Sequence, residues 1–436
     1  MKERSWAGIL VGLFLVVILG VVPAIMVGVG MKYGSENVAI NEVPRVEIDL
    51  NGATLAEINE ADKNVAFTDT DVRMRDNGEI SSYAGVELSG RGNSTSMVAK
   101  KPYNLKFEKR VNLAGDVRAR SWVLLANAYD GTYLRNDVAL HLAGMLGDEY
   151  AAKGEFVELY INKEYVGLYY LAPKTTISKG SVDLKQPLGV LVELDNLYGW
   201  LSACYYTYMG NCLVLKDAVS KDHAAEAMEQ FLIDFDKLEI AVEVGDYATV
   251  EKLIDVESFA KYYLVSEFTS NPDAYSTSWF MYKDGEGDKI HAGPAWDFDL
   301  ALANRNWGGS GRFLPEDSRT REKEVFGVGY YDENGEYIET PQDALISKVM
   351  YYLVRIPEFR EVVGEVFDTK MSGRAEELVR WVWQKSAYTE VAAKKDATKW
   401  GVSGRGADIE KLIDWIQRRY AFFEREYGRA GESRAE

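Results

Sequence analysis

The stretch "HAGPAWDFDLALAN", residues 291–304, places two aspartates, Asp297 and Asp299, among tryptophan, phenylalanine and leucine side chains. In an extended backbone, residues i and i+2 point to the same face, so the two carboxylates should project together. Like charges on one face repel unless a cation lies between them, and carboxylate oxygens favour Mg²⁺, Mn²⁺ or Ca²⁺ over zinc. The pair is therefore a candidate metal site. The alternative is that one aspartate caps a following helix while the other lies in solvent.

A second acidic motif, "SNPDAYSTSW" at residues 270–279, precedes the first. Between the two, residues 278–293 are typical of a β-hairpin that turns at an Asp-Gly dipeptide. A hairpin returns the chain close to its starting point, and we therefore expect Asp273 to lie near Asp297. The alternative interpretation of this motif is a plain Asn-Pro-Asp turn.

A basic motif, "LSGRGNSTSMVAKKPYNLKFEKR", occupies residues 88–110. Gly90 and Gly92 permit close approach of the backbone to a ligand, and Arg91 stands between them. Strand alternation in "YNLKF" puts Lys106 on the polar face of an otherwise packed strand. An arginine fork and a lysine point charge are the groups that bind a polyphosphate. The alternative is a solvated hairpin with surface lysines.

The three motifs together supply what phosphoryl transfer requires: cations for the phosphates, a base for the acceptor hydroxyl and carboxylates for Mg²⁺. Two glutamates on predicted strands, Glu158 and Glu193, are candidate partners for Lys106. The chain has neither a G-x-x-x-x-G-K-[ST] motif nor the G-x-G-x-x-G and H-R-D motifs. It therefore lacks both a P-loop and the ordinary protein-kinase signature.

The composition limits the class of partner and of site. The chain has 436 residues and a formal net charge of −18, which no basic cluster offsets. Binding to nucleic acid requires concentrated Lys and Arg, so nucleic acid is not an expected partner. Two cysteines and three histidines are too few for the usual structural zinc sites. Cys204 and Cys212 bracket the stretch "YYTYMGN", and we expect a disulfide there, with two free thiols as the alternative.

An uncharged segment at residues 6–30 predicts a transmembrane anchor. At about 1.5 Å per residue, a helix of this length crosses the hydrocarbon core of ~30 Å. Lys2 and Arg4 precede it, so residues 1–5 should form a cytoplasmic tip and the rest of the chain should lie outside the membrane. The alternative is a cleaved signal peptide, although no A-x-A site follows the apolar run.

The remaining pattern predicts an α+β fold with a β-rich N-terminal half and a helical C-terminal half. After a polar linker at 31–44, we expect one domain over 45–430. Expected strands, including a hairpin at 155–172, cover 45–50, 85–90, 103–109, 122–127, 155–172, 189–196 and 212–218. Expected helices cover 134–147, 223–240, 257–269, 341–368, 373–388 and 408–427.

The order of the motifs resembles the CotH family of spore-coat atypical kinases. The resemblance rests on "GRGNSTS", "KKPYNLKF", "LRNDVALHLA", "FVELYINKEYVGLYYL" and "NPDAYSTSWFMYKD" followed by "HAGPAWDFDLA", and it covers about residues 45–370. It implies a distant protein-kinase-like fold that binds ATP with Mg²⁺ or Mn²⁺. It also implies transfer of the γ-phosphate to Ser or Thr hydroxyls of surface proteins.

The resemblance also implies roles for single residues. Asp273 matches the catalytic-loop aspartate of the family. Asp297 would hold the metal, and Asp299 would be a second ligand or an orienting group. Arg91 and Lys106 would meet the phosphates.

Two departures from the family pattern bear on activity. Pro173 stands where the hairpin motif usually has Glu, and Ser278 stands where the family often has Asn. Ser278 remains a candidate metal ligand, but it is a neutral one with a single oxygen. A catalytically weak or inactive surface adhesion or scaffold protein is therefore the alternative to an active kinase. Transfer or hydrolysis of another phosphorylated substrate is a third hypothesis.

Overall fold

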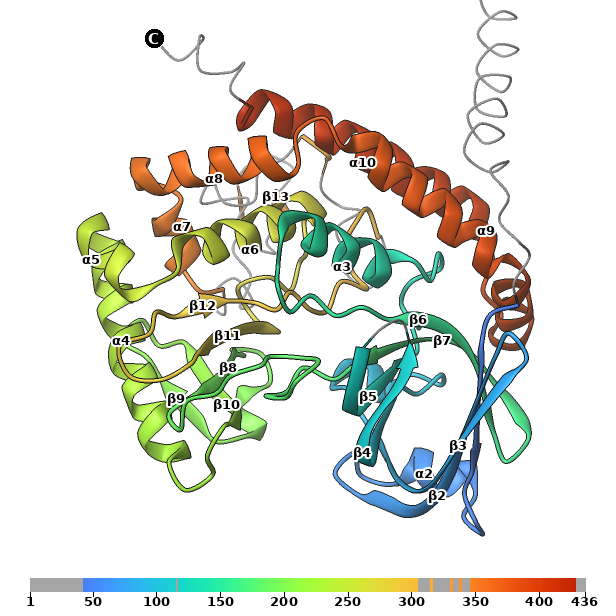
Figure 1. Cartoon of the computed structure of the whole chain (residues 1–436). Helices are drawn as coiled ribbons and strands as arrows, with labels where there is room; N and C mark the ends of the chain where they lie inside the picture. Colours follow the sequence, from blue (N-terminus) through green and yellow to red (C-terminus); the bar gives the residue numbers. More distant parts are fainter. Residues whose placement is uncertain are drawn as a thin grey trace, which may run out of the picture.

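The computed structural model describes residues 42–114, 117–304, 314–316, 330–331, 337–338 and 346–428. Its β-rich N-terminal half and helical C-terminal half confirm the mixed α/β prediction (Figure 1). The predicted cytoplasmic tip, the anchor at 6–30 and all but the end of the linker lie outside the described residues. Among the helices within these ranges, none has the length and apolar character needed to span a membrane.

Seven strands close into a barrel in the order β1-β2-β3-β4-β5-β7-β6. Its strands are β1 (Arg45–Asp49), β2 (Ala66–Asp76), β3 (Glu79–Gly90), β4 (Tyr103–Ala114), β5 (Val117–Leu125), β6 (Glu155–Ile161) and β7 (Glu164–Pro173). The parallel pairing of β1 with β6 closes the barrel, while the other neighbours run antiparallel. Closure leaves the barrel itself without a free sheet edge among the described residues.

Strand alternation fills the barrel. On β4 the side chains of Tyr103, Leu105 and Phe107 are buried in its core, as the sequence predicts. The predicted hairpin of β6 and β7 turns at Asn162 and Lys163, whose φ angles of 50° and 70° are those of a type I′ turn. The sequence pattern therefore specifies both the core and the register of these strands.

A second sheet has the order β12-β11-β8-β10-β9. Its strands are β8 (Val190–Leu194), β9 (Cys204–Tyr206), β10 (Cys212–Ala218), β11 (Trp279–Lys283) and β12 (His291–Ala292). The antiparallel pairing of β11 with β12 confirms the predicted hairpin. A disulfide joins Cys204 to Cys212, with their Cα atoms 5.4 Å apart.

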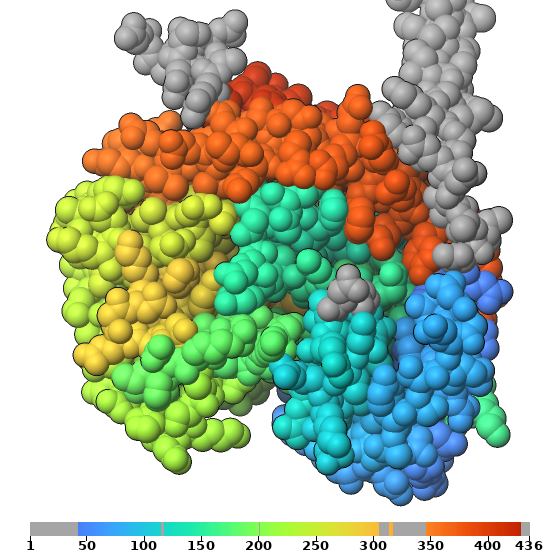
Figure 2. Space-filling view, in the orientation of Figure 1, coloured from blue at the N-terminus to red at the C-terminus, as the bar shows by residue number. Residues whose placement is uncertain are grey.

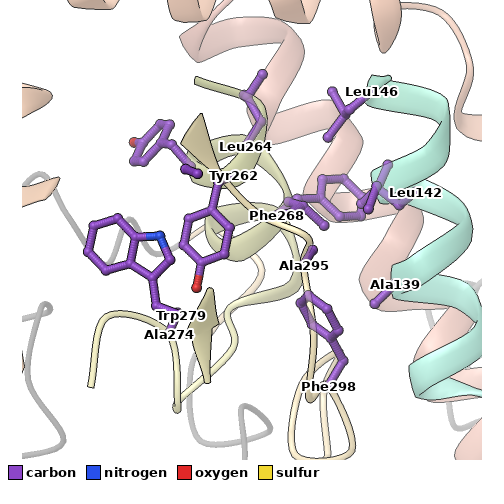
Figure 3. Close-up of a cluster of buried hydrophobic side chains, with 14 of the residues drawn as sticks. Ala139, Leu142, Leu146, Tyr262, Leu264, Phe268, Ala274, Trp279, Ala295 and Phe298 are labelled. Atoms are coloured by element: carbon purple, nitrogen blue, oxygen red, sulfur yellow. The ribbon is translucent and has the colours of Figure 1, made fainter. Parts of the chain in front are cut away.

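Two buried helices support the loops that follow this sheet. Helix α3 (Arg135–Leu146) and helix α6 (Val256–Thr269) contribute most of their side chains to the largest hydrophobic core. Figure 3 shows Ala295 and Phe298 on the segment that lies between these helices. Phe298 is 1% exposed, so the chain around the acidic doublet is anchored by an apolar side chain.

The other helices differ from the prediction mainly at their ends. Pro357 begins α8 and divides the expected helix at 341–368 into two, because proline suits the first turn of a helix and not its interior. Residues 341–345 of that expected helix lie outside the described residues. The remaining elements are α2 (Leu55–Glu60), η1 (Ser94–Met97), η2 (Gly199–Leu201), α4 (Ala224–Val244), α5 (Tyr247–Leu253), β13 (Tyr330–Tyr331), β14 (Tyr337–Ile338), α7 (Val349–Leu353), α8 (Pro357–Lys370), α9 (Ala375–Trp400) and α10 (Arg405–Glu426).

Candidate functional site

A cavity of about 780 Å³ lies between the barrel and the second sheet. Figure 2 shows the surface hollowed between the barrel and the part of the molecule that carries β8 to β10. All three sequence motifs reach this cavity. The predicted site residues that line it are Arg91, Glu193, Asp273, Ser278, Asp297 and Asp299.

The acidic doublet is held by hydrogen bonds from three directions. The side-chain amide of Asn271 donates to the main-chain oxygen of Asp297 at 2.9 Å, and Ser278 Oγ donates to Asp297 Oδ2 at 3.1 Å. The main-chain N–H of Phe298 donates to Asn136 Oδ1 at 2.8 Å. These bonds tie the doublet to α3 and to both ends of the loop that contains Asp273.

The backbone of the doublet is not the extended strand that the sequence suggested. Asp297 has a φ of 67°, in the left-handed region, and no strand covers it. Asp297 and Asp299 both line the cavity because the chain turns at Asp297, rather than because of a β-pleat. The expectation that they share one face holds, but for a different geometric reason.

Burial of Asp299 makes the doublet electrostatically costly. Asp299 is 7% exposed. Desolvation, followed by the nearby charges of Asp297 and Asp273, raises the pKa of Asp299 well above its usual range. A divalent cation between the carboxylates would relieve this repulsion, and the oxygen-only donor set suits a hard ion.

The described residues contain no group of three or more His, Cys, Asp or Glu side chains placed to bind a metal ion. The protein side of such a site would therefore consist of the doublet together with the Ser278 hydroxyl. This small set matches the usual Mg²⁺ sites of phosphoryl-transfer enzymes, where one or two carboxylates are completed by substrate phosphates and water.

Asp273 reaches the cavity on a short loop between α6 and β11. Ser270 ends α6 in a left-handed conformation with a φ of 48°, which turns the chain away from the helix axis. Beyond Asp273, Thr277 Oγ1 donates to Asp195 Oδ1 at 2.7 Å and ties the loop to the end of β8. Asp195 is a cavity residue that the sequence analysis did not identify.

Basic side chains also line the cavity. Lys216 Nζ lies 2.5 Å from Glu193 Oε2, and Lys174 lines the same cavity. Partial burial, then the charges of Arg91 and Lys216, lowers the pKa of Lys174. Burial also lowers the pKa of Arg91, whereas Asp297, the next contributor, acts in the opposite direction. Cations crowded in this way would be stabilised by an anionic ligand.

The loop that carries Arg91 is braced by Lys63, which lies between α2 and β2, and by contacts within the loop. Lys63 Nζ donates to Asn93 Oδ1 at 2.6 Å. Gly92 has a φ of 87°, and a Cβ there would lie 2.1 Å from Thr95 Oγ1. Glycine is therefore required at position 92 by contacts within the loop, in addition to any approach of a ligand.

Two predicted site residues lie away from the cavity wall. Lys106 points outward from β4 and pairs with its cross-strand neighbour Glu87, with 2.8 Å between Nζ and Oε2. Glu158 pairs with Lys395 on α9 at 2.9 Å. Neither Glu158 nor Glu193 is therefore the partner of Lys106. The polar face of β4 was predicted correctly, but that face is the outer surface of the barrel.

Lys63, Lys174 and Lys216 are the cavity cations that sequence reasoning missed. Lys174 follows Pro173 at the end of β7, and Lys216 lies on β10. The only available signal for Lys174 and Lys216 was a lysine within or directly after a strand of otherwise apolar residues. Such a pattern is equally typical of a solvated strand, so it could not single these residues out.

A comparison with protein-family models matches residues 88–423 to the model described as "CotH: CotH kinase protein". No curated protein matches the chain. The matched region includes the glycine-rich loop, the Asp273 loop and the acidic doublet, so it contains all three motifs that line the cavity. Because the match covers most of the chain, the protein belongs to the CotH kinase family.

Proposed function

We propose that the protein is a membrane-anchored, extracytoplasmic kinase that transfers the γ-phosphate of ATP to Ser or Thr hydroxyls of surface proteins. The observation that carries this proposal is a single cavity lined by Asp273, by the doublet of Asp297 and Asp299, and by basic side chains including Arg91 and Lys216. Membership of a kinase family supports a nucleotide and a divalent ion as cofactors. In this proposal the barrel and the helical half act as the two lobes of a distant kinase-like fold.

The residues of the cavity fit the groups that the reaction needs. Asp297 and Asp299 would hold Mg²⁺ or Mn²⁺, and Ser278 would orient Asp297 through its hydrogen bond. The bound ion would neutralise both the carboxylates and the phosphates. Arg91 and Lys216, which line the same cavity, would bind phosphate oxygens, and Glu193 would keep Lys216 oriented.

The transfer itself involves one displacement. The acceptor Oγ forms a bond to the γ-phosphorus while the bond from that phosphorus to the β,γ-bridging oxygen breaks and ADP leaves. Asp273 takes the proton of the acceptor hydroxyl as general base. Its carboxylate is suited to this role because the loop of residues 270–278 is braced by Asn271 and by Asp195.

The two departures from the family pattern are compatible with activity in this arrangement. Pro173 lies opposite Trp122 at the end of β7, and the acidic partner of a cavity lysine is supplied instead by Glu193. Ser278 still places an oxygen against Asp297. These contacts favour the active kinase over the inactive scaffold.

Two measurements on the purified full chain in detergent test the proposal. Mg·ATP or Mn·ATP should raise the melting temperature, since nucleotide at a hundredfold its Kd adds about 2.7 kcal/mol to stability. Radiolabelled autophosphorylation should be seen in the wild type and lost in Asp273→Asn, whereas Asp297→Asn should lose the nucleotide shift. Absence of both the shift and the label would favour the surface scaffold.

We also propose that residues 6–30 form the anchor. The membrane fraction should retain the protein after alkaline carbonate extraction, and protease added to intact cells should cut it. Release by carbonate would contradict an integral anchor.

A further inference from the structure

The hairpin of β9 and β10, residues 204–212, is fixed by a disulfide and by hydrogen bonds to helix α4. The Cys204–Cys212 disulfide joins the two strands. The buried carboxylate of Glu239 on α4 accepts hydrogen bonds from Thr207 Oγ1 at 2.7 Å, from the main-chain N–H of Met209 at 2.7 Å and from the Asn211 side-chain amide at 2.6 Å. Such bonds fix a turn in one conformation before any partner arrives.

This rigid hairpin exposes aromatic side chains. Tyr206 is 66% exposed and Tyr208 is 59% exposed. Beside them lies a second cavity of about 630 Å³, here called the hairpin groove, lined in part by Tyr206, Tyr208, Met209, Ile346, Lys348 and Tyr352. Tyrosine and methionine are enriched where proteins contact other polypeptides.

The hairpin groove adjoins the acidic cavity. Ile346 lines both, and Leu201 and Ser202 form part of the wall of the acidic cavity just before β9 begins. Strand β9 is also the last strand of its sheet in the described part of the chain, where it pairs with β10 alone. A polypeptide along this edge would run from the groove toward Asp273.

We propose that the hairpin groove binds an extended segment of the protein substrate next to its acceptor Ser or Thr. The inference rests on the proposed kinase function and names how that function selects its substrate. The main chain of the segment pairs with the free edge of β9, as in β-strand addition. Large apolar or aromatic side chains on one side of the acceptor pack on Tyr206 and Tyr208 while the hydroxyl enters the acidic cavity.

A library of synthetic peptides with serine fixed at the centre and radiolabelled ATP tests this inference on the full chain. Wild-type protein should favour large apolar residues at positions on one side of the serine. The double variant Tyr206→Ala, Tyr208→Ala should lose about tenfold in kcat/KM for the preferred peptides, through KM. Tyr208→Phe keeps the ring and removes only the 3.3 Å hydrogen bond to Glu243, so it should retain the preference.

Val391→Ala is the matched control, because Val391 is 75% exposed on α9, and Figure 1 shows α9 on the other side of the molecule from β9 and β10. Equal kcat/KM in the wild type and the double variant, or labelling without positional preference, would overturn the inference and leave the kinase function intact. No label with any peptide, together with no melting-temperature shift on Mg·ATP, would overturn the proposed function and this inference with it.

Discussion

Ser278 Oγ lies 3.1 Å from Asp297 Oδ2 and donates a hydrogen bond to it. Both residues have left-handed backbones, with φ angles of 54° and 67°. Such conformations are uncommon outside glycine and are concentrated at functional sites, where surrounding contacts maintain them. The pair is therefore consistent with the ligand site proposed above.

Replacing Ser278 with alanine should weaken metal binding. The variant removes the group that orients Asp297, and loss of such a supporting contact typically lowers metal affinity by about tenfold or more. The Mg²⁺ concentration that gives half of the ATP-induced rise in melting temperature should increase accordingly. Ser278→Asn should lower this Mg²⁺ concentration, because asparagine tolerates a left-handed backbone and offers an amide oxygen. An unchanged Mg²⁺ midpoint in Ser278→Ala would contradict the assigned role.

Lys216 and Lys106 should differ in their effect on nucleotide binding. Lys216→Met removes a cation from the cavity wall and leaves Glu193 without its partner, so the ATP-induced melting shift should be largely lost. Lys106→Met breaks a surface pair with Glu87, in which both side chains are well exposed, and should cost at most about 1 kcal/mol in stability without changing the shift. Loss of the ATP-induced melting shift in Lys106→Met would show that Lys106 contributes to the nucleotide site.

The sequence was sufficient for the parts of the site that depend on local pattern. Hairpin β11–β12 separates Asp273 from Asp297, and a hairpin returns to its origin whatever surrounds it. The β6–β7 hairpin, which turns at Asn162 and Lys163, likewise follows from its local sequence. Spacing alone was therefore enough to bring the two acidic motifs together.

Other features depend on how distant elements pack and could not be read from one segment. The expected role of Lys106 rested on strand alternation, which distinguishes two faces but does not say which face borders a cavity. Lys216 meets Glu193 because β10 pairs with β8, and Lys174 reaches the same cavity from the end of β7. The left-handed turn at Asp297 is imposed by contacts from Asn271, Ser278 and the anchored Phe298 rather than by local propensity.

Asp137 should make stability depend on pH. Burial raises the pKa of Asp137 to about 6, with Lys385, Trp381, Glu155 and Tyr170 also facing it. A carboxyl group whose pKa is raised in the folded state favours folding while it is protonated. This contribution to stability is lost as the pH rises from the pKa of the group in the unfolded chain toward its folded-state pKa of about 6.

Asp137→Asn should remove this dependence while its amide oxygen still accepts the Trp381 hydrogen bond. Relative to the wild type, the variant should gain about 1–3 kcal/mol in free energy of unfolding between about pH 4 and about pH 8. Urea denaturation at several pH values measures the gain. Parallel pH profiles of the two proteins would show that Asp137 does not titrate in this range.

Arg419 on α10 should be essential for stability because it holds the end of α6. Its guanidinium donates to the main-chain oxygens of Glu267 and Phe268 and pairs with the Glu267 carboxylate at 3.2 Å, with both side chains fully buried. Arg419→Met leaves a buried carboxylate and three carbonyls, those of Glu267, Phe268 and Pro315, without these donors, so unfolding free energy should fall by about 3–5 kcal/mol. The neighbouring Arg418→Met breaks only an exposed pair with Glu316 and should cost less than about 1 kcal/mol. Urea denaturation of both variants at neutral pH decides the matter, and equal losses would mean that the buried pair contributes no more than the exposed one.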